Sequence, residues 1–271
     1  MTAVVAVSPA RPTLVRAVCV REWREALGNK LLVGMTLLPP VVILVAGIAA
    51  VAAAAVNPPS DRDVQALYAA APAVAGLDPK EAVQGFIATY FLILFMLIPT
   101  VVPLTMAIYS VIGEKAARTL EPLLATPVGV GELLLAKSLA STIPSVIVTW
   151  LAYGIYLFSV SALGSQAAVR AVTAPRWVLA IVVMVPLLTL LSVTLGVLIS
   201  TRVNDVRVAQ QIGGLVVVPV VSIGILQVTG RVVLSDSSFI GTATFLLVCD
   251  AVVFALARVA FQRENILSRW R

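Results

Sequence analysis

The segment from Gly113 to Glu132, GEKAARTLEPLLATPVGVGE, concentrates charged and polar residues between two apolar stretches of the chain. Its residue types suit recognition rather than catalysis. Thr119 can cap a short helix, and Glu121 falls in the first turn, where a carboxylate meets the positive end of the helix dipole. Pro127 ends the helix. The segment is therefore predicted to form one short helix between two longer ones.

The predicted short helix has one apolar face and follows a polar turn of the chain. Its leucines follow the spacing i, i+3, i+4 and lie on one side; they are Leu120, Leu123 and Leu124. A polar turn precedes them, formed by Glu114, Lys115 and Arg118. So short a helix has no core of its own in which to bury the leucines. They either lie on lipid or dock in a groove of another protein, which is the sharper hypothesis.

Histidine and cysteine, the residues most often used in metal sites and as activated nucleophiles, are almost missing from the sequence. It has no histidine, and its two cysteines, Cys19 and Cys249, stand far apart in apolar surroundings. A metal site would need clustered ligands, so no metal and no catalytic residue is expected. The phosphate-loop pattern G-x-x-x-x-G-K-[ST] and the hydrolase patterns G-x-S-x-G and H-E-x-x-H do not occur. The chain cannot hydrolyse ATP by the phosphate-loop route.

The rest of the chain has the composition of an all-α integral membrane protein. Of its 271 residues 60% are hydrophobic and 12% charged, and mean hydropathy is +1.05. The net charge of +6 does not indicate nucleic-acid binding, because the charges cluster at the ends of apolar runs. Six runs are long enough to cross a bilayer as helices of about 20 residues. They are Leu31–Val56, Phe86–Ile112, Ser138–Val169, Trp177–Thr201, Val208–Gly230 and Ser237–Ala257.

The distribution of basic residues predicts the orientation of these spans. With the N-terminus inside the cell, 14 of the 19 Lys and Arg residues fall on inner segments. The positive-inside rule therefore favours both termini in the cytoplasm. The expected location is the cell's inner (plasma) membrane. The Gly113–Glu132 segment then faces the cytoplasm, between the second and third spans.

The sequence divides into three parts. Residues 1–30 form a cytoplasmic N-terminus, residues 31–260 the six spans with a cytoplasmic segment at 113–137, and residues 261–271 a cytoplasmic tail. From Pro12 a helix is expected to lie at the inner membrane interface, with an apolar face of Val15, Cys19, Trp23 and Ala26. The alternative is a mere cytoplasmic extension. In the longest outer loop, Asp78 is predicted to cap a helix that Pro79 opens.

The segment GEKAARTLEPLLATPV resembles the cytoplasmic signature of type-2 ATP-binding-cassette (ABC) transporter permeases, a family that includes drug, lipid, polysaccharide and sodium exporters. The matching residues are Glu114, Lys115, Thr119, Leu120, Glu121, Leu123, Leu124, Thr126 and Pro127. Arg118 departs from the pattern, because the family usually has glycine there. The six-span layout agrees with the resemblance.

The resemblance implies a transport subunit that works with other chains. In the family, this segment couples the permease to a separate cytosolic ATPase. Two ATPase chains, which bind ATP and Mg, and a second permease copy or related permease would complete the complex. The resemblance also implies export by alternating access. The uncharged spans favour a small amphiphilic or apolar cargo. Ion export, a passive channel, and a scaffold that only recruits a cytosolic partner remain the alternatives.

A substrate pathway is predicted where polar residues accompany prolines inside the spans. The third span carries a stripe beside Pro144 whose members are Ser138, Thr142, Ser145 and Thr149. Asp250 is the one acid deep in an apolar run, where a carboxylate costs about 2.5–3.5 kcal/mol. Each has a simpler explanation: hydroxyls commonly join membrane helices, and a buried aspartic acid can lock the sixth span through a partner such as Gln227. A site for a cation, a proton or a basic group of the cargo is the functional hypothesis.

Overall fold

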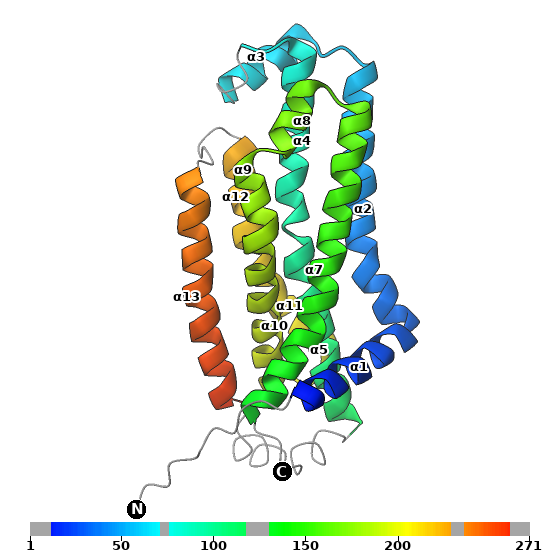
Figure 1. The fold of residues 1–271 in the computed structure, drawn as a ribbon, viewed down its shortest axis with the longest axis vertical. Helices are drawn as coiled ribbons and strands as arrows, with labels where there is room; N and C mark the ends of the chain where they lie inside the picture. The colour runs from blue at the N-terminus through cyan, green and yellow to red at the C-terminus, as the bar shows by residue number, and fades with distance from the viewer. Residues whose placement is uncertain (1–11, 71–75, 118–129, 229–235, 261–271) are drawn as a thin grey trace, which may run out of the picture.

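The computed structural model describes residues 12–70, 76–117, 130–228 and 236–260, and these form helices joined by short connections (Figure 1). The bundle has two ends. One carries α1 and is called here the α1 end; the other carries α3 and α8 and is called the α3 end. The elements are α1 (Pro12–Gly28), α2 (Lys30–Val56), α3 (Asp61–Ala70), α4 (Pro79–Phe95), α5 (Ile98–Ala116), α7 (Val130–Leu163), α8 (Gln166–Val172), α9 (Pro175–Leu179), η2 (Ala180–Met184), α10 (Val185–Arg202), α11 (Val206–Gly213), η3 (Gly214–Val216), α12 (Val217–Val228) and α13 (Asp236–Ala260).

The expectation of an all-α membrane protein is confirmed. Within the described residues, five helical stretches are long and apolar enough to cross a membrane. The fifth apolar run, Val208–Gly230, differs from a single long helix: its described residues are divided into α11, η3 and α12. α11 packs on α5 and α10, and α12 packs on α4. α7 is longer than its predicted run, with 34 residues, or about 51 Å at 1.5 Å per residue.

Prolines explain where the predicted spans are interrupted. The second run was expected to be one helix, but it breaks at Met96 and Leu97, between α4 and α5. Pro99 follows the break and has no N–H to donate back to the preceding turn, so the α-helical ladder cannot pass through unchanged. The fourth run changes to a π-helix at Ala180–Met184, which ends two residues before Pro186. π-Helical turns of this kind often mark functional sites.

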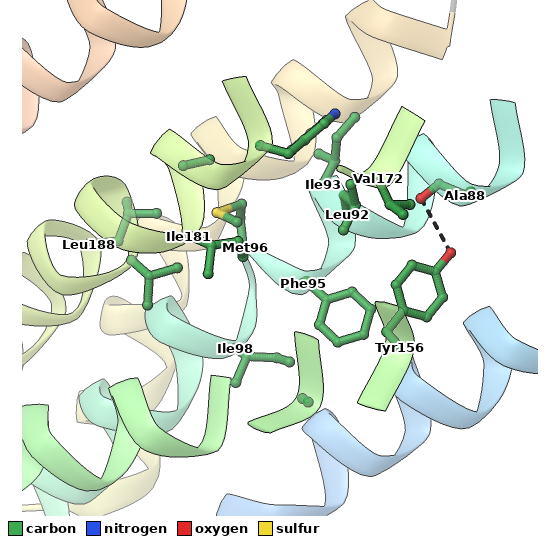
Figure 2. Close-up of a cluster of buried hydrophobic side chains, with 14 of the residues drawn as sticks. Ala88, Leu92, Ile93, Phe95, Met96, Ile98, Tyr156, Val172, Ile181 and Leu188 are labelled. Carbon is green, nitrogen blue, oxygen red and sulfur yellow. Dashed lines mark hydrogen bonds between the residues drawn. The ribbon is translucent and has the colours of Figure 1, made fainter. Parts of the chain in front are cut away.

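The core of the bundle surrounds α4 and α5. In this stretch 78% of the most apolar window is buried, against 22% in α2 and 17% in α13. Figure 2 shows Phe95 of α4 beside Tyr156 of α7, with ring centroids 5.0 Å apart, and the Tyr156 hydroxyl donating to Ala88 O at 3.2 Å. Gly47 lets α2 approach closely, because a Cβ there would meet the Phe91 ring at 2.9 Å.

The connections at the α3 end are helical and partly as predicted. Asp78 caps α4 by accepting from Lys80 N at 3.0 Å, with Pro79 in the first turn, which confirms the predicted start. The third run ends earlier than expected, since α7 stops at Leu163 and α8 begins at Gln166. Gln84 joins these connections to the bundle: its amide donates to Val51 O, and its carbonyl accepts from Ser165 N at 2.8 Å.

Candidate functional site at the α1 end

The segment predicted to dock on another protein falls between α5, which ends at Ala116, and α7, which begins at Val130. Most of its residues lie outside the described part of the chain. These are Arg118, Thr119, Leu120, Glu121, Leu123, Leu124, Thr126 and Pro127, for which docking stays a prediction. Glu114 and Lys115 are described, and they belong to the last turns of α5. The site can therefore be built from the two helices that hold the segment.

Lys137 of α7 lies at the centre of a buried charge cluster. Its Nζ is 2.6 Å from Glu22 Oε1 and 2.8 Å from Glu114 Oε2. It also donates to Ser110 Oγ at 2.8 Å. The side chain is only 3% exposed, and those of Glu114 and Glu22 are 7% and 13% exposed. One cation thus joins α1, α5 and α7. Because the cluster is buried, each charge in it would be energetically costly without its oppositely charged partner.

The second carboxylate oxygen of Glu22 completes the connection between α1 and α5. The Ser110 hydroxyl donates to Glu22 Oε2 at 2.7 Å. Toward solvent, Arg21 Nη2 lies 3.8 Å from Glu114 Oε1, and Arg21 Nε donates to Glu25 Oε1 at 2.7 Å. The hydrogen bond to Glu25 raises the pKa of the Arg21 guanidinium, which is positively charged at any physiological pH. The cluster is therefore continuous from the interior to the surface.

The apolar face of α1 is docked on α7. The Trp23 indole Nε1 donates to Ala140 O at 2.7 Å, and the Cys19 thiol donates to Ala136 O at 3.5 Å. Cys19 is buried, and this burial, together with the negative charge of Glu22, raises the pKa of its thiol. The side chain of Val15 is outside the described residues. Cys19 and Trp23 thus lie on the face of α1 that packs on α7. The position of α1 at the membrane interface, rather than as a mere cytoplasmic extension, stays a prediction.

Lys115 points to a different part of the bundle from its neighbour Glu114. Its ammonium group donates to Ser200 O, to Thr201 O at 3.2 Å and to Val203 O at 3.4 Å. These carbonyls belong to the C-terminal end of α10, where a cation stabilises the negative end of the helix dipole. The Asn204 side chain accepts a further bond at 3.3 Å. Lys115 thereby fixes α5 to the turn between α10 and α11.

The last turns of α5 are thus bonded in two directions immediately before the predicted docking segment. Glu114 and Ser110 connect them to α1 and α7, and Lys115 connects them to α10. A cavity of about 360 Å³ lies beside the cluster, with Trp23, Asn29, Tyr109 and Ser141 among its lining residues.

The predicted polar stripe of α7 is largely inside the bundle. Ser138 is 3% exposed, and Ser145 and Thr149 are fully buried, while Thr142 is partly exposed. The hydroxyl of Ser145 donates to Ser141 O, and that of Thr149 donates to Ser145 O, both at 2.8 Å. Bonds to the preceding helical turn satisfy a hydroxyl without any ligand. A pathway role for these four residues stays a prediction.

Asp250 lies on the face of α13 that packs against α10. It is 6% exposed and shares this face with Leu246 and Ala257. Among the described residues neither carboxylate oxygen has a hydrogen-bond partner. The side chain of Gln227, its suggested partner, is outside the described residues. Asp250 thus faces the interior of the bundle, and its role stays a prediction.

Sequence reasoning missed Glu22, Ser110 and Lys137 as members of one site. Lys137 served only as one of the basic residues that predict the orientation of the spans. Its position between LLLA and SLAS, seven residues after Val130, is nevertheless unusually apolar for a lysine. An isolated charge within an apolar run requires a buried partner, and this signal could have identified it. The identity of the partner on α1 could not be read from spacing.

Two comparisons with known proteins bear on these helices. A sequence model for the family described as ABC-2 family transporter protein matches residues 16–240. The match includes α1 from residue 16 onward, the charge cluster and the segment between α5 and α7. In a comparison with curated proteins, no match is found.

Proposed function

Because the chain belongs to the ABC-2 transporter family, we propose that it is the permease subunit of an ATP-driven exporter and that a separate ATPase docks on the segment between α5 and α7. It is a multi-pass membrane component of a transporter, and the family implies an ABC ATPase as its partner. The ATPase binds ATP and Mg in this proposal. The finer points below concern coupling, assembly and cargo.

Coupling is supported by the charge cluster, which is the single observation that carries the proposal. Closure of the ATPase would displace the segment at residues 118–129. The end of α5 would move with it, and the ion pairs of Glu114 and Lys137 would pass the displacement to α1 and α7. Lys115 would pass it to α10. Packed elements held by such contacts shift as units rather than deform.

The proposed complex contains two permeases and two ATPases, in the plasma membrane with the α1 end in the cytoplasm. The excess of Lys and Arg at this end supports the orientation. The cargo is proposed to be a small amphiphile or apolar molecule, such as a drug or lipid, because the spans carry few charges. Export of sodium or another ion is the second candidate, and the buried carboxylate of Asp250 favours it.

The test of coupling is a charge placed on the predicted leucine face. Burial of one leucine contributes about 1.5–3 kcal/mol, so Leu123→Asp should abolish stable binding of the ATPase. Ala125→Asp is the matched control, since it adds the same charge to the opposite side of the predicted helix. Glu121→Ala should leave the complex assembled but reduce the amount of cargo transported per ATP. Co-purification and permease-stimulated ATP hydrolysis in proteoliposomes measure these effects.

The outcomes separate the candidate functions. Loss of binding in Leu123→Asp, with Ala125→Asp normal, supports docking through the leucines. Equal assembly and transport in Leu123→Asp and the parent would refute it. A chain that binds a cytosolic protein without stimulated ATP hydrolysis or transport would be a scaffold instead.

A further inference from the structure

The π-helical turn η2 has an unusual hydrogen-bond pattern, because a proline follows it. The Val185 N–H donates to Ala180 O, five residues earlier, rather than to Ile181 O as in an α-helix. The π-type donor to Ile181 O would be the N–H of residue 186, but Pro186 has none. Neither the α nor the π pattern therefore supplies a backbone donor for the Ile181 carbonyl.

A side chain of α7 satisfies this carbonyl. The Trp150 indole Nε1 donates to Ile181 O at 2.9 Å. Ile181 is only 5% exposed, and the hydrocarbon of a bilayer offers no water that could replace the indole as a donor. A buried carbonyl without a donor is costly. Trp150 thereby stabilises the π form of the turn.

The α-helical form of this turn would have the opposite balance. It would return the Val185 N–H to Ile181 O, so that the carbonyl no longer depends on Trp150. It would also bring the Pro186 ring against the carbonyl of Val182, four residues earlier, where a proline kinks or breaks a helix. Each form thus has one favourable and one unfavourable feature. A packed element with two such arrangements can act as a switch.

The two forms place α9 differently. Conversion of one π-type turn to an α-type turn rotates the preceding helix by about one residue, which is about 100° of rotation and about 1.5 Å of translation. The helix that precedes η2 is α9, which carries Trp177. The Trp177 ring packs on Phe239 of α13, at a centroid distance of 5.4 Å and an interplanar angle of 79°. The conversion would carry Trp177 out of this contact and release α9 from α13.

The turn borders a space that can accommodate this change. Among the described residues, Ala180 and Met184 line a cavity of about 300 Å³ between α4, α10, α12 and α13. Met96, at the break between α4 and α5, lines the same cavity, so two interrupted helices meet there. Close-packed interiors resist backbone shifts. On this side of η2, a change of register does not have to displace close-packed atoms.

We propose that η2 is a conformational switch that Trp150 holds in its π form. Movement of α7 along α10 separates the indole from Ile181 O, the turn becomes α-helical, and α9 rotates away from α13. Tyr153, one turn farther along α7, donates to Val172 O of α8 at 2.9 Å, so α7 is bonded to both ends of the connection that contains α9. The switch belongs to this chain alone, and its use in the transport cycle rests on the proposed function.

The distance between two spin labels tests the switch in the full chain, reconstituted in lipid vesicles without an ATPase. Cysteines replace Val178 of α9, which is 46% exposed, and Val56 at the end of α2, which is 82% exposed. The background carries Cys19→Ala and Cys249→Ala. Rotation of α9 moves only the first label. Trp150→Phe should increase the second distance population relative to the first roughly two- to tenfold, the range of one neutral hydrogen bond.

Two further variants separate the switch from a general loss of packing. Pro186→Ala should shift the populations in the same direction as Trp150→Phe, because it removes the ring that disfavours the α form. The double variant should show chiefly the second distance. Tyr153→Phe is the matched control, since it removes a hydrogen bond made by the same part of α7 but leaves η2 untouched. It should keep the distance of the parent.

Two results would overturn the proposal. One is a parent-like distance distribution in the double variant Trp150→Phe, Pro186→Ala. The other is an equal second population in Trp150→Phe and Tyr153→Phe, because the rotation of α9 would then reflect a general loosening of α7. The vesicles contain no ATPase, so a failure of the switch is distinguishable from a failure of the proposed coupling.

Discussion

Glu22 and Lys137 are 115 positions apart in the sequence, and their side chains meet at 2.6 Å between Oε1 and Nζ. The pair joins the amphipathic helix α1 to the start of α7, close to where the predicted ATPase-docking segment ends. A buried ion pair adds little to stability compared with an apolar contact, because both charges lose their hydration. Removing only one of the two charges is costly, because the other charge then stays buried without a partner. We therefore expect this cluster to show strong interdependence among its members.

Lys137→Met should destabilise the protein more than either carboxylate substitution. It leaves Glu22 and Glu114 buried without their cation, and breaking a buried pair in this way costs about 3–5 kcal/mol. The midpoint of thermal aggregation in detergent measures the effect. The triple variant Lys137→Met, Glu22→Gln, Glu114→Gln should recover most of the loss. Glu25→Gln, which affects only the exposed pair with Arg21, should change stability by less than about 1 kcal/mol. Additive losses in the triple variant would contradict the cluster.

The thiol of Cys19 should report whether α1 is docked. In a Cys249→Ala background it is the only cysteine of the chain. Because burial and Glu22 raise its pKa, less thiolate is present at neutral pH than for a free thiol, and alkylation should be slow. The rise of the rate with pH should also be displaced to higher pH. Mass spectrometry after timed exposure to a maleimide gives the rate.

Trp23→Ala should accelerate this alkylation by at least about tenfold, because it removes the hydrogen bond to Ala140 O and exposes the face. Glu22→Gln should also increase the rate, by removing both the ion pair and the nearby negative charge. Glu25→Gln on the exposed side is the control and should react like the parent. Rapid alkylation of the parent would show that α1 is not held against α7.

Asp250→Asn should fold and assemble as well as the parent. The amide keeps the shape of the carboxyl group, and among the described residues the aspartate has no cation that would be left unpaired. Under the pathway hypothesis, transport should fall while basal ATP hydrolysis continues. Thr244→Val, on the exposed side of α13, is a control for changes to the helix itself. Equal transport by Asp250→Asn and the parent at every pH near neutrality would leave only a packing role.

The sequence by itself determined the features that depend on local composition. Apolar runs of sufficient length predicted the membrane helices. The pattern at Asp78 and Pro79 predicted the start of α4, because a helix cap depends only on residues within one turn of each other. Pro99 and Pro186 stand beside the interruptions of the second and fourth runs, but each run was expected to be a single helix. The family was visible in the short segment from Glu114 to Pro127, since its residue types follow one another directly along the chain.

The tertiary structure decided which of these residues meet. Glu22, Ser110 and Lys137 belong to three helices, and only the rotation and height of each helix in the bundle bring their polar atoms within hydrogen-bond distance. The same holds for Trp23 on Ala140 O and for Lys115 on the end of α10. Hydrophobic burial is non-directional, so an apolar pattern indicates that a face is covered without specifying what covers it. Side-chain packing between helices supplies that specificity, and here it positions the charge cluster beside the predicted docking segment.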